Sequence, residues 1–62
     1  MNKPLILLIE DEADFREILT AKLIAGGFDV QSAGDGIEGL EKLKTVKPDL
    51  VILDFMMPKM NG

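Results

Sequence analysis

The chain has 62 residues, of which 47% are hydrophobic and 29% are charged, and its net charge is −4. A domain of this size buries only about 60% of the surface that its unfolded chain exposes, so we expect marginal stability. Because the sequence contains no cysteine and no histidine, disulfides and the usual Cys/His zinc site are excluded. The seven basic residues are scattered along the chain, which disfavours direct binding to nucleic acid.

The longest apolar stretch, residues 4–9, is too short to span a bilayer, and the N-terminus lacks the features of a secretory signal. We therefore expect a cytoplasmic protein with no membrane association.

The first element predicted is a strand over Leu5–Ile9, because an unbroken apolar run is typical of a central strand buried on both faces. A helix follows from Asp14, where Asp14 and Glu17 have the spacing of a capping box, and Gly26-Gly27 ends it. The apolar face of this helix is formed by Phe15, Ile18, Leu19, Leu23 and Ile24.

Residues 29–33 are of mixed polarity, as expected of an edge strand. A second helix is predicted from the capping-box pair Asp35 and Glu38 as far as Pro48. Its buried stripe is expected to be Ile37, Leu40 and Leu43, and its basic C-terminal end contains Lys42, Lys44 and Lys47. The apolar run Leu50–Leu53 predicts a second buried strand, which Asp54 closes.

The β-α-β-α-β order indicates an α/β fold with a parallel sheet and helical crossovers. If the strands followed sequence order, the edge-like middle strand would be central and the ends of the first and third strands would lie about 10 Å apart. The apolar pattern favours the order 2-1-3, with the first strand in the centre. Ligands bind at the carboxyl ends of strands where such a sheet changes direction.

Three carboxylates are expected to meet at that edge: Glu10 and Asp11 after the first strand, and Asp54 after the third. Carboxylates this close favour a hard cation, above all Mg²⁺. A carboxylate beside Mg²⁺ is suited to act as a nucleophile toward phosphorus. Acidic residues after strands also serve as helix caps, and the residues alone leave both interpretations open.

Two segments resemble those of response-regulator receiver domains in two-component signalling. Residues 7–12, LLIEDE, resemble the acidic-pair signature of the family, and residues 47–62, KPDLVILDFMMPKMNG, resemble its phosphoacceptor segment almost residue for residue. The resemblance covers residues 1–62, which would be the first half of a receiver domain: three strands, two helices and the loop after the third strand. It implies half of a flavodoxin-like doubly wound parallel sheet with strand order 2-1-3.

By position, the resemblance implies that Asp54 accepts a phosphoryl group. It also implies that Asp11 is the principal Mg²⁺ ligand, that Glu10 assists, and that the backbone carbonyl of Met56 is a further ligand. The implied donor is a phosphohistidine on a histidine kinase or phosphotransfer protein, or a small phosphodonor such as acetyl phosphate. The protein would then be a signalling component and not an enzyme.

Several positions depart from the family pattern. Glu10 stands where Asp is more usual, which lengthens the reach to the metal, and Asn61 stands where Asp is common. Gly39 replaces the usual Ala inside a helix, at an expected cost of about 0.5–1 kcal/mol. The hydroxyl residue and the lysine that contact the phosphoryl group in the family would lie beyond Gly62, so we expect impaired phosphorylation.

A second interpretation comes from Gly34, Gly36 and Gly39, which match G-x-G-x-x-G and have Asp54 about 20 residues on, as in a dinucleotide-binding βαβ unit. Asp35 counts against it, because a carboxylate would stand where the pyrophosphate must bind. This interpretation also leaves the acidic cluster after the first strand unexplained.

A third interpretation is structural. Without further strands and helices, the third strand is expected to be an exposed apolar edge. We therefore expect a homodimer or larger homo-oligomer, a self-assembling half-domain.

Overall fold

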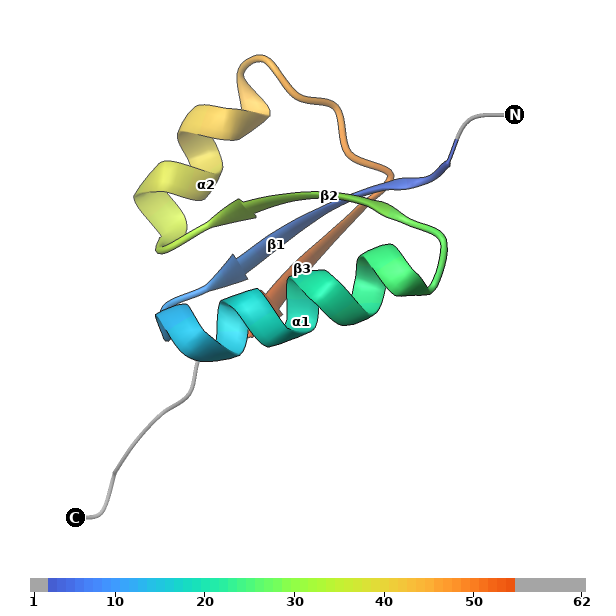
Figure 1. The fold of residues 1–62 in the computed structure, drawn as a ribbon. Coiled ribbons are helices and arrows are strands. Elements are labelled where there is room, and N and C mark those ends of the chain that lie inside the picture. The colour runs from blue at the N-terminus through green and yellow to red at the C-terminus, as the bar shows by residue number, and fades with distance from the viewer. Residues whose placement is uncertain (1–2, 55–62) are drawn as a thin grey trace, which may run out of the picture.

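The computed structural model describes residues 3–54 and contains three strands and two helices. In chain order these are β1 (Leu5–Glu10), α1 (Ala13–Ala25), β2 (Asp29–Ala33), α2 (Gly36–Leu43) and β3 (Leu50–Asp54). The sheet is parallel with the order β2-β1-β3, and the two helices lie on opposite faces of it (Figure 1). The predicted α/β fold and its strand order 2-1-3 are confirmed.

The core of the described residues is centred on β1. Ile6, Leu7, Leu8 and Ile9 are at most 5% exposed, and the one other buried apolar residue is Ala33 at the end of β2. An element that is apolar on both faces and paired on both edges has nowhere else to lie than the middle of a sheet. The prediction of a central strand is therefore confirmed, and so is the edge position of β2.

Asp49 fixes the amino end of the sheet. Its side chain accepts a hydrogen bond from the backbone N–H of Leu5 at 2.7 Å, and its own backbone N–H donates to the carbonyl of Leu5, also at 2.7 Å. On the other side of β1, the N–H of Asp29 donates to the carbonyl of Pro4 at 2.9 Å. The registers of both outer strands are thus set at one end of β1, and their carboxyl ends are aligned at the other.

Helix α1 begins one residue earlier than predicted. Glu12 is the N-cap, and its side chain accepts a hydrogen bond from the backbone N–H of Phe15 at 2.9 Å. The expected capping box of Asp14 and Glu17 is wrong, because the chain turns directly after β1 and Glu12 is already the extended residue before the first helical turn. The predicted stop is confirmed: Gly26 caps the helix and Gly27 has a φ of 101°, which favours glycine.

Helix α2 has the predicted start. Asp35 accepts a hydrogen bond from the backbone N–H of Glu38 at 2.8 Å. The side chain of Glu38 accepts from the N–H of Gly34, one residue before the position that a capping box requires. The helix ends at Leu43 and not near Pro48, because the chain needs the residues between them to return to the amino end of the sheet (Figure 1).

The buried stripe predicted for α2 is wrong. Its residues Ile37, Leu40 and Leu43 are 77%, 65% and 40% exposed. Strand β3, predicted to be buried, is exposed at Leu50, Val51 and Leu53. The expectation of an exposed apolar edge is confirmed instead, since only β1 pairs with β3 in the described part of the chain.

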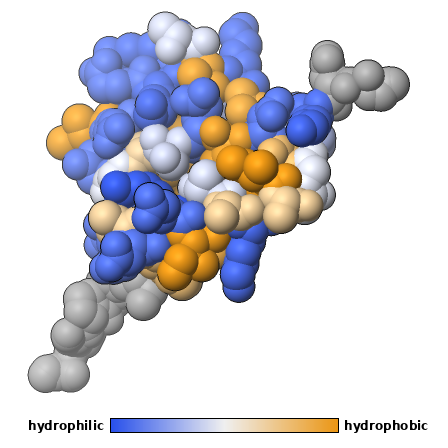
Figure 2. Space-filling model, viewed as in Figure 1, coloured by the Kyte–Doolittle hydropathy of each residue, from blue (hydrophilic) through white to orange (hydrophobic). Residues whose placement is uncertain are grey.

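Apolar surface is accordingly visible between the hydrophilic regions of the molecule (Figure 2). Of residues 3–54, neither helix has the length and apolar character needed to cross a membrane.

Gly39 allows α2 to lie close to the central strand. It is buried, and a Cβ atom at this position would clash with Cδ1 of Ile9 and lie 3.0 Å from its Cγ1. The glycine that the sequence comparison treats as a weak point in the helix is therefore the point of closest packing between helix and sheet.

This packing predicts a coupling between residues 39 and 9. The substitution Gly39→Ala alone should leave the free energy of unfolding unchanged or lower it. The gain in helix propensity, about 0.5–1 kcal/mol, is offset by the clash with Ile9. In an Ile9→Val background, which lacks Cδ1 but keeps Cγ1, the same change should be more favourable than in the wild type and should recover part of that gain. Urea unfolding followed by circular dichroism measures both values.

Gly36→Ala is the matched control, because a Cβ there meets no atom within 4 Å. Its effect should be independent of residue 9. Equal effects of Gly39→Ala in the two backgrounds would contradict the packing argument.

Candidate functional site

The candidate site lies at the carboxyl edge of the sheet. Glu10 is the last residue of β1 and Asp54 is the last residue of β3, and the strand register pairs them directly. Asp11 follows β1 and is exposed, whereas Asp54 is partly exposed and Glu10 is completely buried. Met56, the fourth predicted site residue, lies outside the described residues.

The side chain of Glu10 is held at one oxygen only. Its Oε2 accepts a hydrogen bond from the backbone N–H of Glu12 at 2.9 Å. Its Oε1 is buried and has no hydrogen-bond partner among residues 3–54. A buried acceptor without a partner is rare in folded proteins and calls for an explanation.

The electrostatics of the site keep Glu10 from ionising easily. Burial raises the pKa of Glu10, and the neighbouring carboxylates of Asp11 and Asp54 raise it further. The hydrogen bond from Glu12 acts in the opposite direction but does not cancel the rise in pKa. The site therefore concentrates more negative charge than the chain itself compensates.

A hard cation fits this environment. Among residues 3–54, no three acidic side chains are grouped closely enough to hold a metal by themselves. Mg²⁺, however, usually keeps several waters and needs only one or two carboxylates from the protein. The unpartnered Oε1 of Glu10 supplies such an oxygen, and Asp11 and Asp54 are the carboxylates beside it.

Arg16 is a site neighbour that sequence reasoning missed. Its Nη1 donates a hydrogen bond to the backbone carbonyl of Glu10 at 2.8 Å. Arg16 is not among the residues of the apolar face predicted for this helix, and no other role was predicted for it from the sequence. A possible signal is its distance of four residues from the N-cap, which places it over the end of the preceding strand.

The structure gives the glycine motif another explanation. The N-terminus of α2, where a pyrophosphate would bind, is occupied by the chain's own carboxylates: Asp35 accepts from the N–H of Glu38, and Glu38 accepts from that of Gly34. Gly39 does fill the packing role of the third glycine of such a motif. Helix capping and helix packing thus account for the motif without a nucleotide.

Comparison with known proteins decides the family. The model of the response regulator receiver domain matches residues 6–62. The chain belongs to the response regulator receiver domain family. The flavodoxin-like interpretation of the half sheet agrees with this assignment.

Three relatives show where such receiver sequences occur. The receiver chain is 52% identical over its whole length to a probable transcriptional regulator, ycf27, of Porphyridium aerugineum, and covers 26% of that protein. It is 47% identical, again over its whole length, to the alkaline phosphatase synthesis transcriptional regulatory protein PhoP of Bacillus subtilis, and covers 25% of it. It is 41% identical over 98% of its length to hybrid signal transduction histidine kinase D of Dictyostelium discoideum, of which it covers 4%. The chain thus spans about a quarter or less of these relatives.

The buried carboxylate predicts how the stability of this receiver chain depends on pH. Because the folded state raises the pKa of Glu10 above its ordinary value of 4.5, the folded state binds this proton more tightly than the unfolded state. The stabilisation is present below pH 4.5 and is lost as the pH rises through the raised pKa. In the presence of a metal chelator, Glu10→Gln should therefore increase the free energy of unfolding at pH 7 and flatten its decline above pH 4.5.

Urea unfolding across this pH range measures the effect. Glu17→Gln is the control, since it removes the same charge from an exposed position on α1. A Glu10→Gln variant that is less stable than the metal-free wild type at pH 7 would contradict the argument that the buried, ionised Glu10 carboxylate destabilises the folded state.

Proposed function

We propose that this chain is a phosphoacceptor segment in which Asp54 receives the phosphoryl group. The observation that carries the proposal is the β1–β3 register, which pairs Asp54 with Glu10 at the carboxyl edge of the parallel sheet. Family membership and the site chemistry both support it.

Burial supports one part of this assignment, the exclusion of Glu10 as the acceptor. Glu10 is fully buried and already accepts the N–H of Glu12, so it cannot approach an incoming phosphorus atom. Asp54 is partly exposed at the end of an edge strand and is open to a donor. Asp11 is exposed as well, so the choice of Asp54 as the nucleophile rests on its place in the segment that resembles the phosphoacceptor segment of the family. Glu10 and Asp11 are the residues proposed to hold the cation.

The reaction is a direct transfer. An oxygen of Asp54 forms a bond to phosphorus while the phosphorus–nitrogen bond of a phosphohistidine, or the phosphorus–oxygen bond of acetyl phosphate, breaks. The leaving imidazole takes up a proton, and Asp54 becomes an acyl phosphate. The proposed Mg²⁺ ligands are Glu10, Asp11, Asp54 and the backbone carbonyl of Met56, some of the carboxylates acting through bound water. The cation would neutralise charge on the phosphoryl oxygens.

The proposed partner is a histidine kinase or a phosphotransfer protein. The likeness to a hybrid signal transduction histidine kinase supports a donor of this class. The expectations that this segment does not contact nucleic acid and acts in the cytoplasm stay predictions.

Incubation with acetyl phosphate and Mg²⁺ tests the proposal. We expect a single phosphoryl adduct by mass spectrometry, in low yield, which Asp54→Asn abolishes. Asp49→Asn is the control, because Asp49 lies at the opposite end of the sheet. An adduct that persists in the Asp54→Asn variant would contradict the assignment of the acceptor.

The open apolar face supports a second proposal, self-association into a homodimer or larger oligomer. A groove of about 610 Å³ lies between α2 and β3, and its apolar lining is Ile9, Ile37, Leu40, Leu43, Val51 and Leu53. Exposed apolar residues of this number are costly in water. A self-assembling half-domain without phosphotransfer activity is thus the alternative to the first proposal.

Sedimentation at tens of micromolar tests the association. We expect a species larger than a monomer, and a shift toward the monomer in Leu40→Glu and Leu53→Glu variants, which place a charge in the groove. Ile24→Glu is the matched control, because Ile24 is also an exposed apolar residue, at 52%, but belongs to α1 on the other face. A monomeric wild-type chain would contradict the proposal.

A further inference from the structure

Arg16 connects helix α1 to the end of the central strand. Its backbone N–H donates to the carbonyl of the N-cap Glu12 at 2.8 Å, so its position belongs to the first turn of the helix. From there its guanidinium reaches back over the turn and donates to the carbonyl of Glu10 at 2.8 Å. The hydrogen bond is partly buried and spans the segment that contains Asp11.

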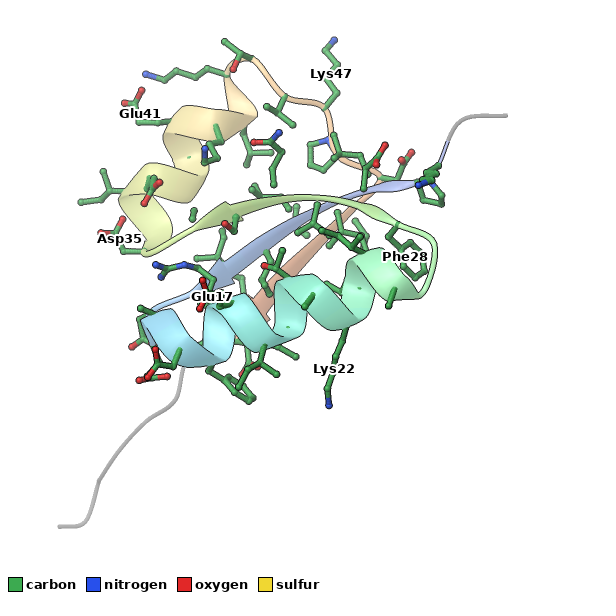
Figure 3. The ribbon with its side chains drawn as sticks, viewed as in Figure 1. Glu17, Lys22, Phe28, Asp35, Glu41 and Lys47 are labelled. Atoms are coloured by element: carbon green, nitrogen blue, oxygen red, sulfur yellow. The ribbon has the colours of Figure 1, made fainter. Side chains whose placement is uncertain are left out.

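The same guanidinium also lies against the turn between β2 and α2. Its Nη1 is 3.2 Å from the position that a Cβ atom of Gly34 would occupy, and Oε1 of Glu38 is 3.5 Å from that position. Glu38 is in turn bonded to the N–H of Gly34. The labelled residues Glu17 and Asp35 show that α1 and α2 both begin at this end of the sheet (Figure 3).

Charge pairing does not explain the position of Arg16. Within residues 3–54, the one ion pair joins Lys44 and Glu41, at the far end of α2. Arg16 donates a hydrogen bond to a backbone carbonyl and not to a carboxylate, although acidic residues surround the turn after β1. A backbone contact fixes geometry, whereas an ion pair would lower the charge of the site.

We propose that Arg16 is a positioning residue for the proposed cation site. By holding the carbonyl of Glu10, it fixes the direction in which the chain leaves β1, and with it the orientation of the Glu10 and Asp11 carboxylates. The inference rests on the proposed function, in which these two residues hold Mg²⁺. Outer contacts of this kind commonly change metal affinity by 10–100-fold.

Two roles of Arg16 predict opposite results. If its charge matters most, replacing it with methionine removes a repulsive cation and tightens Mg²⁺ binding. If positioning matters most, Arg16→Met weakens Mg²⁺ binding despite the more negative site. We expect the dissociation constant for Mg²⁺ to rise about tenfold, by analogy with such outer contacts.

Calorimetric titration of the chain with MgCl₂ measures this constant in four proteins: the wild type, Arg16→Met, Arg16→Lys and Lys22→Met. Arg16→Lys keeps the charge but loses the planar fork, so its affinity should lie between those of the wild type and Arg16→Met. Lys22→Met removes the same charge from the last turn of α1 and should bind no more weakly than the wild type.

The amide NMR signal of Glu12 is a second readout. Because this N–H donates to Oε2 of Glu10, its chemical shift reports the orientation of the Glu10 carboxylate. We expect it to move in the metal-free Arg16 variants and to stay in place in Lys22→Met. If Arg16→Met does not fold, the Arg16→Lys variant decides, since unchanged affinity and an unchanged Glu12 signal there overturn the proposal.

The outcomes separate the two proposals. A wild-type chain that binds no Mg²⁺ overturns the proposed metal site and the role of Arg16 with it. A wild type that binds Mg²⁺, together with an Arg16→Met variant that binds equally or more tightly, overturns the positioning role alone.

Discussion

The structure depends on one strand that is apolar on both faces and paired on both edges. Strand β1 supplies nearly all of the buried apolar surface of the described residues, and every other element contacts it directly or lies beside it. No second cluster of buried apolar residues lies within residues 3–54 to compensate. The position of β1 therefore sets the strand order, the registers and the edge at which a site can form.

The same burial makes the site costly. The buried ladder of β1 runs as far as Glu10, so the carboxylate at its end is removed from water together with the apolar residues before it. A buried carboxylate with one unsatisfied oxygen lowers stability unless a cation accompanies it. The proposed function and stability thus make opposite demands on Glu10, and a local departure from good packing rules is expected at a functional position.

The sequence was most informative where a residue's role depends on its immediate neighbours. The central strand, the stop at Gly27 and the cap at Asp35 could all be predicted, because each reflects a run of hydrophobicity or a short-range hydrogen bond. The cap at Glu12 was missed because two acidic residues compete for this role, and only the sharp turn after β1 decides between them.

Burial was predicted less well because periodicity reports which face a helix can bury, and not whether a partner covers it. Ile37 and Leu40 follow the helical period and are nevertheless exposed, since no described element lies over them. The contact of Arg16 with Glu10 joins two elements across a turn, and no pattern of spacing encodes it. The three carboxylates of the site were named from the predicted strand order, whereas Met56 and the separate roles came from resemblance, and these roles stay predictions.

Glu10 and Asp54, the residues at the two sides of the proposed site, are fixed by different numbers of contacts. Glu10 follows directly on residues that are paired on both sides, and it is also held by hydrogen bonds with Glu12 and Arg16. Asp54, in contrast, ends a strand that pairs with β1 alone among the described residues. A cation bound by both residues would connect Glu10 at the end of β1 to Asp54 at the end of β3. Because such a ligand binds only the folded arrangement, it would stabilise the pairing of β3 with β1 by mass action. If the proposed cation site exists, its occupation would therefore favour the paired edge strand, and the proposed chemistry of Asp54 would be linked to the stability of the strand that carries it.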